Sequence, residues 1–494
     1  MHKILFILSA LLMGFSQQPW GLGFIAWFSL LPVIFFLNEE TKIKRIILYS
    51  FLWGFIYHIT FLNWLAGNVG IEIIFLRYAT MLLVVLFLSL NISLIFLLFY
   101  YFKKITKSEK SIYFLPFIFV GVEYIRSLGL YGFTWNSLSY TQVDYLLISQ
   151  IIEYTGIYGL TFWIVIVNLT IYNVLNRNNK NNVLIALLCF LMPWLIGSVI
   201  KNNIIESSDK LKIKIVQPNI PLQEKRKGLN HSLERLLSLS TLSSNDSISL
   251  IIWPESSIPS RLNRNSIYNS KLSTKMNNFL KNSNFSLVAG LETSSGKNRY
   301  NSSILFKKDS IINIYNKQRL VPNVEYTPKF FNDIGLNMGQ IGFNIGEDLT
   351  MFNVNKINFA SMVCIESIFS SPTRDFVNNG ANFLVYIVND GWYIKAPEPQ
   401  QHAKRSIYRA IESRRFVVRA ANTGISMVVD LYGNITQRLD LNKQGVIETH
   451  ISSNDTKTFY TKYGDVFSIF NIFVLILALL SFNFKRIFER KNEV

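Results

Sequence analysis

Three polar side chains in the second half of this chain are of types that together perform nucleophilic catalysis. Cys364 ends an apolar run, and Glu255 and Lys317 each follow one. A thiol attacks a carbonyl group only as the thiolate, so it needs a base or a nearby cation. We therefore expect Glu255 to be the base for Cys364. Lys317 would lower the thiol pKa and, with the backbone N–H of Ile365, stabilise an oxyanion.

The number and placement of the cysteines support a catalytic reading of Cys364. The chain has two cysteines, and the other, Cys189, lies in a long apolar run. This placement does not predict a disulfide, so Cys364 is either a small buried residue or a nucleophile. Taken alone, Glu255 could be a loop carboxylate and Lys317 one charge on a solvated face. No histidine stands in an obvious catalytic motif, which argues against a Cys–His protease.

The elements that must position these residues divide the chain into an apolar part and a mixed part. Half of the 494 residues are hydrophobic and only 16% are charged, which indicates a membrane protein. The first apolar run could be a signal peptide, but it lacks a clear cleavage site, so we expect an uncleaved helix. We predict eight membrane spans, at residues 3–16, 21–38, 47–65, 78–102, 112–128, 155–175, 183–200 and 464–483.

The distribution of positive charge predicts the topology of these spans. Lysine and arginine follow spans two, four, six and eight, whereas the turn at 66–76 has neither. Basic turns stay in the cytoplasm, so both termini are expected inside and residues 201–463 outside. Part of the net charge of +18 comes from these cytoplasmic turns. The remaining positive charge suggests contact with anionic lipid headgroups. The basic residues are scattered without a binding motif, which argues against nucleic acid.

The segment 211–450 reads as alternating strands and helices. Short apolar runs predict strands, among them 249–253, 286–290, 357–365 and 383–388. Other stretches predict helices at 229–242, 268–282, 371–379 and 401–419. The three reactive side chains end or follow predicted strands, as does Asn389-Asp390. In α/β folds, sites collect where strands end, so we expect one shared pocket.

Several motifs resemble the carbon–nitrogen hydrolase (nitrilase) superfamily. They are Val216–Pro221, Ile252–Pro259, Tyr315–Pro322 and Cys364–Glu366. Nearly the full chain resembles the membrane-embedded branch of that superfamily, the apolipoprotein N-acyltransferases. That likeness includes Asn389–Trp392, Arg409–Glu412, Gly132–Trp135 and Tyr140-Thr141-Gln142. The combination is specific, although no single motif is; Arg409 and Glu412 alone could be an ordinary surface pair.

The resemblance implies a polytopic α-helical membrane domain with about eight spans and an extracytoplasmic α/β nitrilase-like domain, an α-β-β-α sandwich. The expected domains are 1–204 (membrane), 205–455 (catalytic) and 456–494 (C-terminal helix and basic tail). By resemblance, Glu255 is the general base, Lys317 the oxyanion-stabilising lysine and Cys364 the nucleophile of a catalytic triad. The resemblance implies neither a metal nor a cofactor.

The resemblance also implies roles for supporting residues. Glu325 resembles a second glutamate that supports the lysine and the thiol, and Glu366 resembles a further acidic residue beside the cysteine. Trp392 resembles part of a mobile region over the pocket, and Trp135 a membrane-side position near the substrate entrance. Without the resemblance, Glu325 could be a surface charge, Glu366 a helix cap, and the two tryptophans interfacial aromatics.

Two positions depart from the family pattern. Ile365 stands where family members often have tyrosine, and Val324 stands where they often have glycine. Both departures leave the triad intact, but the local shape of the pocket and the flexibility of the loop stay open.

The activity implied by the resemblance is acyl transfer at the outer face of a bacterial inner membrane, in the periplasm. Cys364 would take an acyl chain from a phospholipid, typically phosphatidylethanolamine, as a thioester. The N-terminal amine of diacylglyceryl-cysteine in an apolipoprotein would then accept it in a ping-pong cycle. We expect a monomer. One alternative is a membrane-tethered nitrilase or amidase, for which one anchor would suffice. Another is a transporter with a non-catalytic outer domain, which predicts more ionisable residues within the spans.

Overall fold

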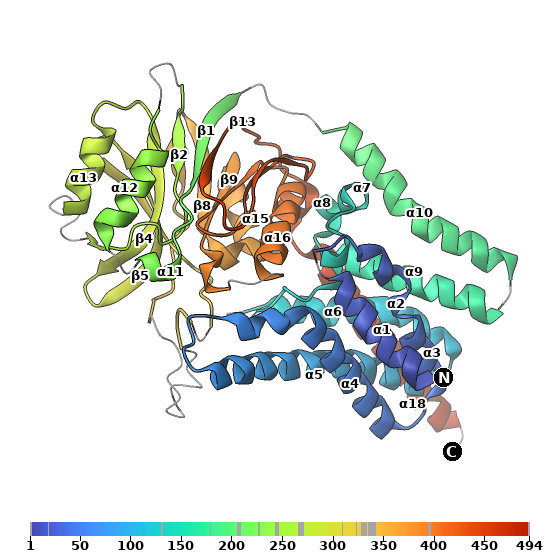
Figure 1. Cartoon of the computed structure of the whole chain (residues 1–494). Coiled ribbons are helices and arrows are strands. Elements are labelled where there is room, and N and C mark those ends of the chain that lie inside the picture. Colours follow the sequence, from blue (N-terminus) through green and yellow to red (C-terminus); the bar gives the residue numbers. More distant parts are fainter. Residues whose placement is uncertain are drawn as a thin grey trace. The chain divides into compact units, whose positions relative to one another are not determined.

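The computed structural model divides into two compact units (Figure 1). One unit combines Met1–Ile204 with Tyr463–Val494, and the other is Ile205–Lys462. Two predictions fall partly outside the described part of the chain: residues 205–208 of the predicted catalytic domain and residues 268–270 of the predicted helix 268–282. The structure describes all residues except 1, 18, 130–131, 178, 205–208, 226–227, 243–246, 265–270, 309, 323, 328–332, 334–341, 394–396 and 493–494.

The first unit is helical, and helix occurs at each of the eight predicted spans. Proline at the start of α3 and of α6 suits a helix N-terminus, where the missing N–H has no partner to lose. The helices are α1 (His2–Ser16), α2 (Ala26–Ser29), α3 (Leu31–Glu39), α4 (Ile43–Leu62), α5 (Ile74–Thr106), α6 (Leu115–Ser127), α7 (Leu146–Ser149), α8 (Ile152–Thr155), α9 (Tyr158–Arg177), α10 (Lys180–Asn202) and α18 (Val466–Asn492).

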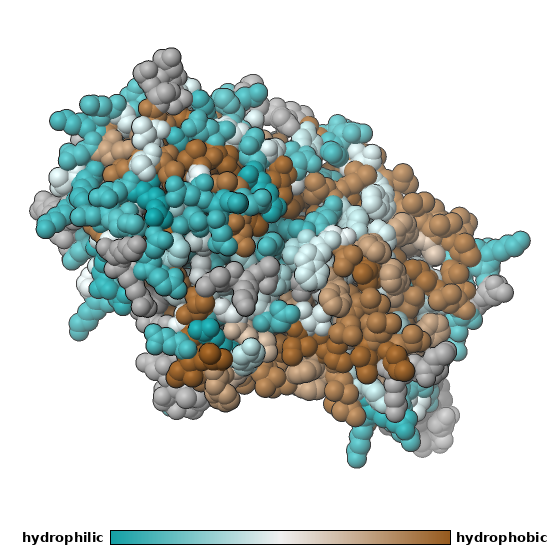
Figure 2. Space-filling view, viewed as in Figure 1, coloured by the Kyte–Doolittle hydropathy of each residue, from teal (hydrophilic) through white to brown (hydrophobic). Residues whose placement is uncertain are grey.

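Four helical segments among the described residues are long and apolar enough to cross a membrane. They are Ile43–Gly67, Ile74–Thr106, Tyr158–Asn176 and Lys180–Asn202. Figure 2 shows hydrophobic residues gathered over this unit, and large apolar side chains such as Leu188 and Leu195 on α10 are exposed. An apolar surface of this extent marks contact with lipid or a partner. The total of eight spans remains a prediction, because the helices in Ile4–Ser16, Gly23–Glu39 and Val466–Phe482 are shorter.

Polar side chains hold the irregular segment that follows α6. The Glu123 carboxylate accepts hydrogen bonds from the Leu138 N–H (3.0 Å) and from the Thr161 hydroxyl (2.8 Å). Arg126 donates to the Phe133 carbonyl at 3.0 Å. Non-helical backbone among apolar helices needs such partners, because no water is available to satisfy it. The Gly132–Gln142 motifs of the sequence therefore belong to a buried, hydrogen-bonded segment.

The second unit contains two β-sheets in the described part of the chain. The first has the order β13-β1-β2-β4-β5-β6, with β3 paired to β4, and the second has the order β12-β11-β10-β9-β8-β7. The first comprises β1 (Lys210–Gln217), β2 (Leu250–Ile252), β3 (Arg261–Asn263), β4 (Ser286–Ser295), β5 (Asn298–Lys307), β6 (Ser310–Asn316) and β13 (Gly445–Ser452). The second comprises β7 (Phe352–Val354), β8 (Ile357–Val363), β9 (Phe383–Val388), β10 (Val417–Ala421), β11 (Ser426–Val429) and β12 (Ile435–Leu439).

Helices cover the outer faces of the two sheets, which gives four layers (Figure 1). The apolar faces of α12 and α13 bury residues such as Leu236 and Met276 in one core with Trp253. The two sheets meet through Ser303 of β5 and Ser361 of β8, whose hydroxyls are 2.7 Å apart. The helices are α11 (Leu222–Lys225), α12 (Leu229–Leu239), α13 (Lys271–Leu280), α15 (Ser370–Asn378), α16 (Glu398–Ser413) and α17 (Phe459–Tyr463), with the short 3-10 turns η6 (Cys364–Ile368) and η7 (Asp390–Trp392).

The predicted helix 401–419 was wrong at its C-terminal end. The helix α16 ends at Ser413, and Arg414 adopts a left-handed conformation with φ 50°. The β-branched pair Val417-Val418 then joins β10, which pairs in parallel with β9. Pairing with β9 therefore makes Val417–Arg419 part of a strand, although the sequence pattern predicted a helix there.

Gly290 on β4 allows the chain after β2 to approach closely. A Cβ at this position would lie 2.6 Å from the Glu255 Cα and 2.8 Å from the Pro254 carbonyl oxygen. We expect Gly290→Ala to destabilise the protein by about 1–3 kcal/mol, as overpacking does. The thermal midpoint of the detergent-solubilised protein measures this effect. Ser295→Ala, at the exposed end of the same strand, is the control, and equal midpoints for both variants would contradict the prediction.

Candidate active site

Cys364 lies where the buried strand β8 turns into η6. Its φ is +54°, in the left-handed region that residues other than glycine rarely adopt. Such a conformation costs about 1–3 kcal/mol and persists only where surrounding contacts impose it. A strained turn between a strand and a helix is also how hydrolases present a nucleophile. Cys364 is partly buried and is a free thiol.

Glu366 ties this turn to the end of β6. One carboxylate oxygen accepts a hydrogen bond from the Val363 N–H at 2.7 Å. The other accepts from the Tyr315 hydroxyl (2.7 Å) and from the N–H groups of Gln318 (2.7 Å) and Arg319 (3.1 Å). Burial raises the pKa of Glu366 even though these donors act to lower it. Glu366 therefore links the cysteine turn to the lysine loop and is no cap for α15.

Lys317, Glu255 and Glu325 form one buried cluster. The lysine Nζ lies 2.9 and 2.8 Å from the two Glu325 carboxylate oxygens and 3.6 Å from Glu255 Oε1. The Asn301 amide donates to Glu255 at 2.7 Å and to Glu325 at 2.8 Å. All four side chains are buried, so Glu325 is not the surface charge that it could have been.

The electrostatics of the cluster set the protonation of its members. Burial acts to lower the pKa of Lys317, but the charges of Glu325 and Glu255 outweigh it and hold the pKa above its usual value. Burial raises the pKa of Glu255, opposed by Lys317 and assisted by the charge of Glu325. Lys317 is therefore a permanent cation, and Glu255 is a stronger base than a solvated glutamate.

Lys317 does act to lower the pKa of the Cys364 thiol, as expected, but other influences outweigh it. Burial raises the pKa of the thiol well above its usual value, and the charge of Glu255 raises it further, while Lys317 acts only partly against them. The resting nucleophile is thus a neutral thiol. Its proton must leave as the new bond forms, which is the task of a general base rather than of a preformed thiolate.

The remaining predicted residues lie in different places. Ile365 follows Cys364 in η6 and is partly buried, as is Trp392 at the end of η7. Val324 lies in the turn before Glu325 and donates its N–H to the Val321 carbonyl at 3.3 Å. Trp135 belongs to the helical unit, where its ring centroid is 5.0 Å from that of Trp64.

Two features of the site differ from the sequence reading. Arg409 and Glu412 are fully buried and form an ion pair with two nitrogen–oxygen distances of 2.9 Å, one of which is a hydrogen bond, so the surface-pair alternative was wrong. Asn301, which bridges the two glutamates, was not predicted. The only sequence signal for it is the polar run Asn301–Ser303 inside a strand pattern, which is also typical of a solvent-facing edge.

Comparison with known proteins now identifies the family. Residues 212–460, half of the chain, match the family described as Carbon-nitrogen hydrolase, and residues 9–170 match the Apolipoprotein N-acyltransferase N-terminal domain. The chain belongs to the carbon-nitrogen hydrolase family. Within that family, the match to the N-terminal domain and the curated relatives place it with the apolipoprotein N-acyltransferases.

The curated relatives cover nearly the whole chain. An Apolipoprotein N-acyltransferase from Thermotoga maritima is 29% identical over 99% of this chain and 94% of its own. One from Chlorobaculum tepidum is 28% identical over 93% of this chain and 92% of its own. Among solved structures, a nitrilase-superfamily amidase from Nesterenkonia matches 51% of this chain and 93% of its own, at TM-score 0.38 and 16% identity.

The raised pKa of Glu255 predicts how the reactivity of Cys364 depends on pH. The base is lost as pH falls through this pKa, so alkylation of the thiol by iodoacetamide should decline with an apparent pKa above 4.5. The apparent value belongs to the cluster with Glu325 and Lys317. Glu255→Gln should abolish this decline and leave only the rise at high pH where the thiol ionises.

The measurement is the alkylation rate from pH 4 to about pH 10, in a Cys189→Ala background so that one thiol reacts. A Glu255→Gln profile that coincides with the unsubstituted profile would show that Glu255 is not the base.

Proposed function

We propose that this chain N-acylates apolipoproteins, using a phospholipid as acyl donor and a thioester on Cys364 as intermediate. The relatives of nearly equal length are named for this activity. The observation that carries the proposal is the buried cluster in which the Lys317 Nζ lies 3.6 Å from Glu255 and 2.8 Å from Glu325. The charges of Lys317 and Glu255 both act on the pKa of the Cys364 thiol. A thiol, a buried base that can take its proton and a fixed cation that can stabilise an oxyanion are the groups that acyl transfer uses.

The first half-reaction transfers the acyl chain to the enzyme. Glu255 takes the thiol proton as the Cys364 sulfur attacks the ester carbonyl of the phospholipid. Lys317 and the Ile365 N–H stabilise the oxyanion of the tetrahedral intermediate. The intermediate collapses by breaking the bond to the glycerol oxygen, which receives the proton from Glu255. A lysophospholipid leaves, and the thioester remains on Cys364.

The second half-reaction passes the chain to the lipoprotein. The neutral α-amine of diacylglyceryl-cysteine attacks the thioester carbonyl and gives a proton to Glu255. The bond between carbon and sulfur breaks, and the thiolate takes that proton back. An amide and a free thiol result, so the cycle returns the enzyme unchanged.

The helical unit explains why such an enzyme would lie in a membrane. Both substrates carry acyl chains, and moving a chain into water costs about 0.8 kcal/mol per CH₂ group. We propose eight spans, a catalytic unit in the periplasm and both termini in the cytoplasm of a bacterium, at its inner membrane. Phosphatidylethanolamine is the proposed donor, the enzyme is a monomer, and Trp135 and Trp392 contact the lipid substrates.

The alternatives differ in what receives the acyl group. A membrane-tethered amidase would use the same side chains but pass the acyl group to water, and it would not need the N-terminal domain that residues 9–170 match. A transporter would have no use for a base, a cation and a thiol in one cluster.

Mass spectrometry of the purified protein after incubation with phosphatidylethanolamine tests the proposal. We expect an added acyl chain on Cys364 that Cys364→Ala abolishes and that Cys189→Ala, the matched control, leaves in place. A diacylglyceryl-cysteine peptide should discharge the adduct and become N-acylated. Discharge by water with no acylated peptide would favour the hydrolase, and the absence of an adduct would contradict the covalent mechanism.

A further inference from the structure

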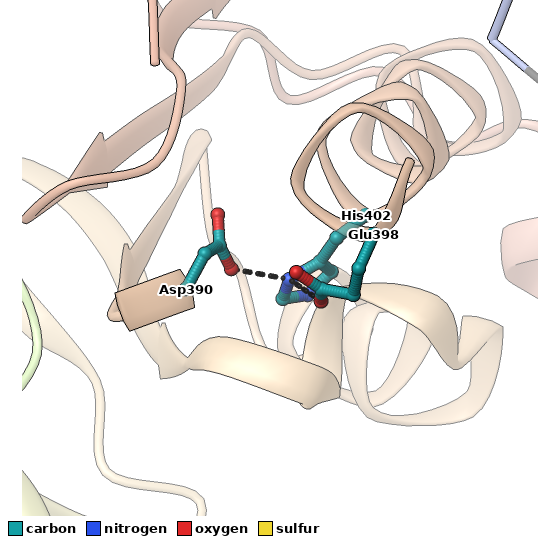
Figure 3. A group of neighbouring side chains, drawn as sticks. All are labelled: Asp390, Glu398 and His402. Atoms are coloured by element: carbon teal, nitrogen blue, oxygen red, sulfur yellow. Dashed lines mark hydrogen bonds and ion pairs between the residues drawn. The ribbon is translucent and has the colours of Figure 1, made fainter. Parts of the chain in front are cut away.

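A second buried cluster contacts the nucleophile turn and takes no part in the steps above. Asp390 of η7 and Glu398 and His402 of α16 place their polar atoms within 4.8 Å of one another (Figure 3). Arg419 of β10 joins them, and all four side chains are buried. Burying this many polar groups costs free energy unless they form hydrogen bonds or ion pairs with one another.

The imidazole of His402 connects this cluster to Cys364. Its Nδ1 lies 2.8 Å from Asp390 Oδ1, as the dashed line in Figure 3 shows. Its Nε2 lies 3.2 Å from the Cys364 carbonyl oxygen and 3.1 Å from the Ser367 hydroxyl. The Ser367 Oγ lies 3.0 Å from the Cys364 carbonyl oxygen, so its single hydroxyl proton can be donated either to that carbonyl or to the ring nitrogen. The ring therefore reaches from a carboxylate to the backbone of the nucleophile.

The carboxylate that orients the ring is itself fixed. Arg419 donates to Asp390 Oδ2 at 2.8 Å and to the Ile425 carbonyl at 3.1 Å. A Cβ at Gly424 would lie 2.1 Å from the same Asp390 oxygen, so the carboxylate occupies space that only a glycine at this position leaves free. Burial acts to raise the pKa of Asp390, but Arg419 and His402 outweigh it and lower the pKa. Asp390 is thus ionised and accepts a hydrogen bond from Nδ1–H of the ring.

The same facts argue against a metal ion at this cluster. The guanidinium of Arg419 already neutralises Asp390. Burial and the charge of Asp390 raise the pKa of Glu398 well above its usual value, so Glu398 is a neutral acid and a poor metal ligand. The cluster is better described as a hydrogen-bonded support for the ring.

We propose that His402, oriented by Asp390, is a positioning residue that holds the left-handed turn of Cys364. The turn presents the thiol and the Ile365 N–H to the substrate carbonyl, and its strain requires contacts that impose it. A protonated ring donates from Nε2 to the Cys364 carbonyl, and a neutral ring accepts the Ser367 hydroxyl at the same nitrogen. In both states the ring is bonded to the turn. This inference rests on the proposed function, because positioning matters for the reaction of the thiol.

The test compares His402→Leu, which removes both ring contacts, with His402→Gln, whose amide retains a donor and an acceptor. All variants carry Cys189→Ala, and thioester formation from phosphatidylethanolamine is followed before steady state. Misplacement of about 1 Å costs up to ~10²-fold in rate. We expect His402→Leu to slow thioester formation roughly 10- to 100-fold with little change in the KM for phospholipid, and His402→Gln to recover part of the loss.

Two further variants separate positioning from general stability. Lys404→Gln changes a partly buried side chain of the same helix, α16, that is not part of the cluster, so it should leave the rate unchanged. Ser367→Ala removes the hydroxyl that contacts both the ring and the Cys364 carbonyl, and it should slow the reaction even if His402→Leu does not fold. Alkylation of Cys364 by iodoacetamide reports on the thiol without any lipid, and thermal midpoints report on folding.

The outcomes are distinct. The proposal is supported if His402→Leu slows both thioester formation and alkylation at an unchanged thermal midpoint, and if His402→Gln recovers part of the rate. Unchanged rates in both His402 variants would overturn it, as would losses that only follow the thermal midpoint. If the unsubstituted enzyme forms no thioester, the proposed function fails instead, and the alkylation rates still decide whether His402 positions the thiol.

Discussion

The site depends on one buried cation held between two carboxylates. If Lys317 were absent, the carboxylates of Glu255 and Glu325 would be two like charges that share the Asn301 amide in a buried site. One of the two would then have to become protonated. Removing one partner of a buried ion pair typically costs about 3–5 kcal/mol. The lysine therefore keeps Glu255 ionised enough to act as a base, and the same ammonium is available to a developing oxyanion.

The fold brings Glu255 and Lys317 to the Cys364 thiol because strands of the two sheets end at the same site. Glu255 follows β2 in the first sheet, and Cys364 follows β8 in the second. Ser303 and Ser361 bond the sheets to each other, and Glu366 bonds the cysteine turn to the loop of Lys317. A nucleophile with a raised pKa can be useful in such a setting, because the neutral thiol is stable until a substrate carbonyl arrives and the base is already in place.

The sequence predicted the parts of this arrangement that follow from local pattern. Apolar runs bounded by Pro254 or by polar residues marked the strand ends, so Glu255, Lys317 and Cys364 could be expected near one another. Asn301 was missed because a polar residue inside a strand faces either solvent or a site, and local pattern cannot distinguish the two. His402 was missed for a similar reason, since its partners Asp390 and Cys364 lie 12 and 38 residues away. The end of α16 was misplaced because pairing with β9 decides it.

The central claim is that Glu255 and Lys317 act on Cys364 as one unit, and a double-mutant cycle on thioester formation tests it most directly. Groups that act together show non-additive losses. The account predicts that Glu255→Gln and Lys317→Met each lose nearly as much rate as the double variant. Losses that multiply, so that the double variant is slower by the product of the two single effects, would contradict it.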